Sequence, residues 1–195
     1  MATSLFDRLE TEARRRNIDN RTRAARNWFQ SQAKKLGAMD REQLLKDPSL
    51  NQVKQVGPGH MHMFFYDPKT KEKLPYYDRF PLVIIVDSAP GGFVGLNLHY
   101  LAPGLRAQFL DRLYQTLTDK RFTEDTRFKL SYDMLKSAAK YKHFKPCVKH
   151  YLTKQVRSRF ARIPAPEWEI ATFLPTADWQ KASQSQVYKD SKGMI

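Results

Sequence analysis

Cysteine is nearly absent from this sequence, with Cys147 as its single example among 195 residues. One cysteine excludes a disulfide within the chain, and disulfides are the usual staples of small proteins exported to oxidising compartments. Residues 1–16 also lack the apolar run of a secretory signal peptide. We therefore expect a protein that is made and kept in a cytoplasm, or that is packed into something assembled there.

Long apolar runs are also missing. The longest, Leu82–Val86, is far shorter than the ~20 residues that a helix needs to cross a bilayer. Apolar residues make up 41% of the chain, slightly below the usual ~45–50%, but aromatic residues at 12% supply bulky material for a core. The composition predicts a folded protein without a membrane partner.

Acidic residues are scarce relative to basic ones. The chain has 34 Lys and Arg against 20 Asp and Glu, which gives a net charge of +14 and a pI near 9.9. Such an excess repels itself in a compact fold, and a polyanionic partner relieves that repulsion. Duplex DNA carries one charge per ~1.7 Å of axis, and anionic lipid surfaces attract the same residues. DNA is the partner that this balance favours most.

Helical patterns dominate residues 1–56, where Gly37 and Pro48 are the only glycine and proline. Two apolar stripes with helical spacing are separated by a predicted break at Asn17–Asn20. The stripes are Leu5, Phe6, Leu9 and Ala13, followed by Ala24, Ala25, Trp28, Phe29, Ala33 and Leu36.

The zone from Gly57 to Leu101 is typical of strands. Turn residues at Asp67–Thr70 and Ala89–Gly92 separate runs that are rich in β-branched and aromatic residues. The expected strands are His60–Tyr66, Leu82–Val86 and Phe93–Tyr100. They predict a small antiparallel sheet.

Helical spacing returns after Pro103. Helices are expected over Leu105–Leu117, Ser131–Tyr141 and Pro146–Val156, then a strand over Trp168–Leu174 and a polar tail with one helical turn at Ala177–Ala182. The fold class is thus α+β, a small antiparallel sheet flanked by helices with a helical N-terminal extension. The expected division is 1–56 for the extension, 57–175 for the core domain and 176–195 for the C-terminal tail.

The positive charge is concentrated in two parts of the chain. Between Lys120 and Arg162 there are thirteen basic and three acidic residues, a net charge of +10. An arginine cluster near the N-terminus is the second part. Lys and Arg neutralise phosphates, so we expect non-specific contacts with the DNA backbone, made by basic helices. The candidate nucleic-acid-binding residues are Arg14, Arg15, Arg16, Arg21, Arg23, Arg26, Lys136, Lys140, Lys142, Lys145, Lys149, Lys154, Arg157 and Arg159.

Aromatic residues alternate with the basic ones in the same stretch. Exposed rings could stack on bases of a single strand, but at helical spacing aromatic residues more often belong to the core. Nothing in the stretch encodes base readout, so we expect no sequence specificity.

Candidate metal and catalytic motifs are weak. His143, Cys147 and His150 are zinc-ligand types at a suitable spacing, but there are only three, Pro146 interrupts them, and no CxxC pair supports them. A nuclease would need clustered carboxylates, and Asp67, Glu72, Asp78 and Asp87 follow no recognisable metal-binding pattern. We expect no catalytic residues, metal or cofactor, and we keep a metal-dependent nuclease only as a third hypothesis.

Several long blocks between Gly57 and the C-terminus have a familiar sequence: Phe64–Val83, Gly95–Leu101, Trp168–Ala171, Phe173–Thr176 and Lys189–Lys192. These blocks resemble small virion proteins of T4-like tailed phages. The N-terminal helical zone carries no such resemblance.

The resemblance implies a structural protein of the virion, of the type that protects the ends of packaged DNA. Its expected partners are DNA and other virion proteins, with which it could form oligomers in the particle. The alternative is an assembly protein of the neck, tail or baseplate that binds other virion subunits and has no affinity for free DNA. Neither implication transfers a functional residue to this chain.

Overall fold

The structure is a computed structural model of the chain. It describes residues 5–19, 21–35, 41–48, 50–118, 120–121, 123–140 and 142–194.

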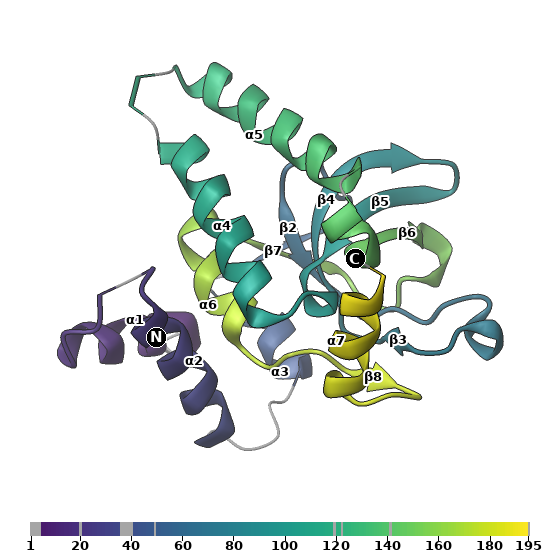
Figure 1. Ribbon diagram of the computed structural model, residues 1–195, viewed down its shortest axis with the longest axis horizontal. Helices are drawn as coiled ribbons and strands as arrows, with labels where there is room; N and C mark the ends of the chain where they lie inside the picture. Colours follow the sequence, from purple (N-terminus) through teal and green to yellow (C-terminus); the bar gives the residue numbers. More distant parts are fainter. Residues whose placement is uncertain are drawn as a thin grey trace.

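A six-stranded antiparallel sheet forms the centre of the described part of the chain (Figure 1). Its strand order is β1-β7-β2-β4-β5-β6, so β7 from the second half of the sequence lies between β1 and β2, and β6 forms the opposite edge. Two short strands, β3 and β8, pair with each other outside this sheet. The strands are β1 (Asn51–Val53), β2 (Met61–Met63), β3 (Tyr77–Asp78), β4 (Leu82–Ala89), β5 (Gly92–Asn97), β6 (Val148–Leu152), β7 (Phe160–Ile163) and β8 (Trp179–Gln180).

Seven α-helices occur in the described residues. They are α1 (Leu5–Arg15), α2 (Arg23–Lys35), α3 (Arg41–Leu45), α4 (Pro103–Thr118), α5 (Glu124–Lys140), α6 (Trp168–Phe173) and α7 (Gln184–Gly193). Five short 3-10 helices connect them: η1 (Lys71–Lys73), η2 (Leu98–Tyr100), η3 (Lys142–Cys147), η4 (Thr153–Gln155) and η5 (Ala165–Glu167). In Figure 1, α4 and α5 run side by side to the upper left, and α1 and α2 lie at the lower left. The α+β prediction is confirmed.

The two faces of the sheet bury different cores. Successive strand residues point to opposite faces, so β4 sends Leu82 and Ile84 to one side and Val83 and Ile85 to the other. We call the side that packs against the helices the inner face. The opposite side, the outer face, carries a compact aromatic cluster: Phe64, Tyr66, Val83, Ile85, Phe93, Tyr151 and Phe160.

Several predicted elements are confirmed. The first apolar stripe lies on α1, which buries Phe6, Leu9 and Ala13. The break that follows it contains Asn17 with φ 53°, a left-handed conformation that ends a helix and that asparagine adopts more readily than most residues. The predicted β4–β5 hairpin turns at Gly91, with φ 72°.

Two segments were assigned to the wrong type of element. Val148–Leu152 is strand β6 rather than part of a helix, because it pairs along its whole length with β5. Trp168–Phe173 is helix α6 rather than a strand. All six residues of α6 are buried. A short run that is buried all round carries no periodicity from which helix and strand can be told apart.

The helical turn expected at Ala177–Ala182 is wrong, because Trp179–Gln180 forms strand β8 and the C-terminal helix starts at Gln184. Helix α7 covers residues 184–193 and buries Val187 completely. At the other end of the chain, β1 pairs with β7. Contacts therefore join the three predicted parts, 1–56, 57–175 and 176–195, and the division into domains stays a prediction.

Candidate nucleic-acid interface

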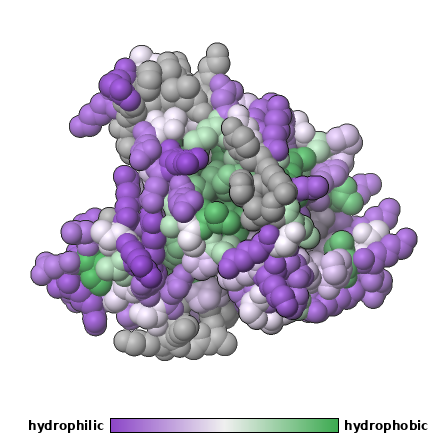
Figure 2. Space-filling model, in the orientation of Figure 1, coloured by the Kyte–Doolittle hydropathy of each residue, from purple (hydrophilic) through white to green (hydrophobic). Residues whose placement is uncertain are grey.

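The arginine cluster of α1 lies among acidic neighbours. Residues 5–19 contain four basic and four acidic side chains, so the segment is neutral overall. Arg14 pairs with Glu10 and Arg16 pairs with Glu12, one helical turn away. Figure 2 shows hydrophilic side chains along these N-terminal helices, at the lower left. Such exposed pairs add little stability, and they offset the local positive charge that phosphates would meet.

The arginines that follow α1 differ from it in their burial and in the residues they contact. Arg26 is only 8% exposed, and its guanidinium donates hydrogen bonds to Asp111 of α4 and Glu169 of α6. The Arg21 guanidinium lies 4.3 Å from the centre of the Tyr114 ring. Arg23 is exposed. Arg26 therefore fastens α2 to the helical layer, and we remove it from the candidate DNA contacts.

Residues 134–166 carry nine basic side chains and no acidic one. The structure places seven of them in α5, η3, β6, η4 and β7, and Arg157 and Arg159 in the loop before β7, so the expectation of basic helices is wrong for its second half. Lys136 is engaged with Asp87, at 2.9 Å, and Lys149 is half-buried. The Lys142 side chain lies outside the described residues. The remaining candidates of this stretch are exposed: Lys140, Lys145, Lys154, Arg157 and Arg159.

Three adjoining strands at one edge of the sheet, β1, β7 and β2, contain no Asp or Glu. On β7, Arg162 points to the outer face, because it is two residues from the outer-face residue Phe160. Its guanidinium lies 3.2 Å from Nδ1 of His60. Lys54, exposed just after β1, was missed as a candidate, although the lack of acidic residues around it is visible in the sequence.

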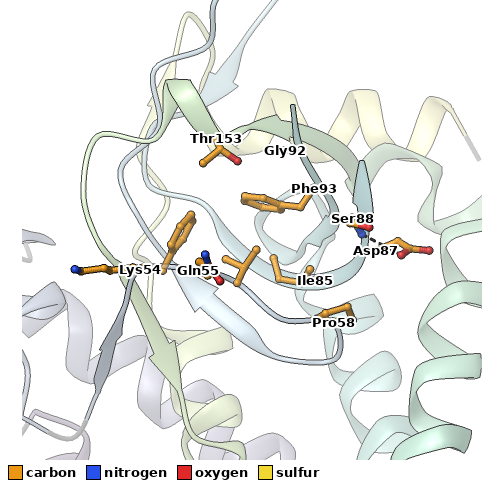
Figure 3. A pocket seen from close by; sticks show the side chains of 11 residues that line it. Lys54, Gln55, Pro58, Ile85, Asp87, Ser88, Gly92, Phe93 and Thr153 are labelled. Atoms are coloured by element: carbon orange, nitrogen blue, oxygen red, sulfur yellow. Dashed lines mark hydrogen bonds between the residues drawn. The ribbon is translucent and has the colours of Figure 1, made fainter. Parts of the chain in front are cut away.

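A cavity of about 310 Å³ opens on this outer face. Figure 3 shows Phe93 and Ile85 at its centre, with Thr153 on one side, Pro58 on another and Lys54 at the periphery. Three further cations adjoin lining residues: Lys154 follows Thr153, Arg159 precedes Phe160, and Arg162 follows it by two positions. We call these four residues, Lys54 in the lining and Lys154, Arg159 and Arg162 next to the lining residues along the chain, the outer-face cations.

Three of the four carboxylates considered for a nuclease have separate partners. Asp67 binds Lys71 and Asp87 binds Lys136. Asp78 is buried 2.6 Å from Nδ1 of His99. Within the described residues, no three His, Cys, Asp or Glu side chains gather as metal ligands.

The contact between Asp78 and His99 belongs to a chain of side chains that the sequence did not reveal. His99 Nε2 lies 3.1 Å from the Thr176 hydroxyl, so Asp78, His99 and Thr176 are aligned like a catalytic triad. All three are buried, and Asp78 also accepts hydrogen bonds from the backbone of Phe80 and Asp178. Substrate cannot reach a hydroxyl that is fully buried. The triad therefore attaches the segment after α6 to the sheet.

The thiol of the suggested zinc motif is turned inward. Cys147 is buried, its Sγ donates to the carbonyl of Phe144, and burial raises its pKa to about 12. His150, on β6, is exposed. The His143 side chain lies outside the described residues.

Comparison with known proteins decides the family. The family model of the phage T4 terminal DNA protecting protein matches residues 6–193, almost the whole chain. The chain belongs to the phage T4 terminal DNA protecting protein family. Searches of curated proteins and of solved structures found no match.

The match to the terminal DNA protecting family confirms the resemblance to T4-like phage proteins and extends it to the N-terminal helices, which had shown none. The family is described by its action on DNA termini and not by a catalytic activity. A position in the neck, tail or baseplate and an interaction with other virion proteins stay predictions. No helix in the described residues is both long and apolar enough to span a membrane.

A buried histidine on the outer face should make the stability of this family member depend on pH. Burial lowers the pKa of His62 from 6.5 to about 4. Between these values the unfolded chain binds a proton that the folded chain does not, so the free energy of unfolding should fall by about 3 kcal/mol as pH drops from 6.5 to 4. We expect His62→Gln to flatten this dependence in urea denaturation measured between pH 7.5 and 4.

The control for this test is His150→Gln, on the exposed side of β6. It should leave the pH dependence unchanged. Equal slopes for the wild type and His62→Gln would contradict the burial of an uncharged His62.

Proposed function

We propose that this protein binds the ends of duplex DNA through phosphate contacts made by the outer-face cations and so denies those ends to exonucleases. The observation that supports this most is the lack of acidic residues in β1, β7 and β2, where Lys54, Arg159 and Arg162 lie together. A phosphate backbone placed there meets cations without a competing carboxylate from these strands. The family match supplies the expectation of DNA termini.

The residue types on this surface favour binding to DNA without recognition of its base sequence. Lysine and arginine side chains at the outer face present charge and N–H donors, which position a phosphate backbone but do not distinguish bases. Lys140 at the end of α5, Lys145 in η3 and Arg157 after η4 are also exposed and extend the positive stretch along the chain. Binding should therefore depend on the DNA end and on ionic strength, and not on the sequence of the duplex.

The proposal is tested with linear duplex DNA and a covalently closed circle of the same sequence. We expect affinity for the linear DNA to fall about 10³-fold or more between 50 and 200 mM salt, the response to roughly six or more phosphate contacts. In an exonuclease assay at low salt, the protein should lengthen the lifetime of the linear DNA.

Two results would overturn the proposal. One is equal affinity for the circle and the linear duplex, because the end would then have no role. The other is binding that does not change with salt, because phosphate contacts release counterions when they form.

A further inference from the structure

We propose that a pocket lined by tyrosines, on the far side of η4 from the outer-face cavity, binds the terminal nucleotide of the DNA end, with Lys149 on its phosphate. This inference rests on the proposed function and identifies the part of the DNA that the end-binding site recognises. It is carried by the aromatic walls of the pocket and by the position of Lys149.

The tyrosine pocket has a volume of about 400 Å³, which is in the range of small-molecule binding sites. Its walls come from the loop before β3, from η2, from β6 and from the end of α7. The tyrosines that line it are Tyr66, Tyr76, Tyr77, Tyr100 and Tyr151.

The tyrosine pocket is continuous with the proposed DNA-binding face. Tyr66 and Tyr151 belong to the aromatic cluster of the outer face, with ring centres 4.9 Å apart. Leu152 lines the tyrosine pocket and the next residue, Thr153, lines the cavity beside the outer-face cations. A DNA end that lies over the outer face can therefore place its last nucleotide across η4.

Lys149 brings a positive charge into these aromatic walls. Its Nζ lies 3.9 Å from the centre of the Tyr100 ring, and no carboxylate among the described residues pairs with it. Burial lowers the pKa of Lys149, since the ammonium group is partly removed from water. Exposed Lys69 also lines the pocket. The acidic lining residue, Asp78, is already engaged with His99. A phosphate would supply the anion that Lys149 lacks.

The tyrosines can contact both the phosphate and the base of a nucleotide. Burial raises the pKa of Tyr66, Tyr100 and Tyr151, so their hydroxyls stay protonated. Tyr66 and Tyr151 are themselves buried, and their hydroxyls accept hydrogen bonds from the Leu152 backbone and from Asn97. Tyr76 and Tyr77 are only half-buried, so their hydroxyls can donate to a phosphate oxygen. Aromatic rings provide faces on which any base can stack.

A terminal nucleotide fits this pocket better than an internal one. Taking a base out of the middle of a duplex costs the stacking and pairing on both of its sides, a few kcal/mol, whereas a terminal pair has a neighbour on one side only. A phosphate at the end of a strand is also not linked to a further nucleotide. The pocket would therefore distinguish an end from the continuous duplex, which the exposed cations alone cannot do.

The test uses DNA hairpins with one open end that carries a 5′-phosphate, a 3′-phosphate or only hydroxyls. We expect the wild type to bind one of the phosphorylated ends about tenfold more tightly than the hydroxyl end, as measured by fluorescence anisotropy. The two phosphorylated hairpins show which strand enters the pocket. Lys149→Met should remove this preference and leave the affinity for the hydroxyl end within about twofold. Lys149→Arg should retain part of the preference.

Lys46→Met is the matched control, because Lys46 is exposed and precedes β1, at the opposite edge of the sheet from β6. It should keep the preference for a phosphorylated end. Thermal melting of each variant checks that it folds. Equal wild-type affinities for all three hairpins, or a preference that survives Lys149→Met, would overturn the inference and leave the proposed function standing. Absence of binding to every hairpin would overturn both.

Discussion

Replacing Arg106 by alanine should lower the free energy of unfolding by about 3–5 kcal/mol. Arg106 lies in the first turns of α4 and is only 6% exposed. The loss should appear as a lower denaturant midpoint with an unchanged slope, followed by tryptophan fluorescence or circular dichroism.

The reason is the number of segments that this one guanidinium joins. Arg106 donates hydrogen bonds to the carbonyls of Leu101, Thr172 and His99, and to the hydroxyl of Tyr188. These acceptors lie before α4, in α6, in η2 and in α7. Alanine would remove these side-chain donors from the carbonyls of Leu101 and Thr172, whereas the His99 carbonyl would keep the hydrogen bond that Gln184 donates. An unsatisfied buried polar group costs about 1–3 kcal/mol.

Arg112→Ala is the matched control, because Arg112 is exposed on the same helix. It should change the free energy of unfolding by less than about 0.5 kcal/mol. Similar losses for the two variants would show that helix α4 itself, and not the buried guanidinium, accounts for the effect.

Replacing all four outer-face cations by glutamine should weaken binding to linear DNA at least about a hundredfold near 0.1 M salt. The physical reason is counterion release, since each phosphate contact contributes about −0.9 to the slope of log affinity against log salt. Losing up to four contacts should make that slope less negative by about 3 to 4. Both quantities are measured by titrating the wild type and the variant at several salt concentrations.

The control changes the net charge by the same amount at exposed sites on or next to helices α1, α3 and α7, which pack against the inner-face core: Arg8, Arg15, Lys46 and Lys189, each replaced by glutamine. This variant should keep most of the affinity and nearly all of the slope. Equal losses for the two variants would show that overall charge attracts the DNA and that no particular face binds it. A larger loss of affinity for the control would indicate that the arginines of α1, and not the outer-face cations, contact the DNA.

The local sequence pattern was enough to predict an element where the spacing or the type of its residues alone decided its structure. The apolar stripe of α1, the start of α4 at Pro103 and the β-branched run of β4 each follow from spacing or residue type. The net charge indicated a polyanionic partner, and the long blocks between Phe64 and Thr176 indicated the phage family. The sequence also contained the absence of acidic residues from 134 to 166, because a count of charge needs no coordinates.

Tertiary structure alone decided which of the cations face solvent together. Arg26 and Arg23 are three residues apart on one helix, yet Arg26 is buried on Asp111 and Glu169, which follow it by 85 and 143 residues. β1 and β7 become neighbours across more than a hundred positions, and that pairing places Lys54 beside Arg159 and Arg162. Charge and periodicity are local properties, whereas burial and pairing depend on contacts between distant segments. The sequence by itself therefore determined the partner class, and the packing decided the surface on which we propose that DNA binds.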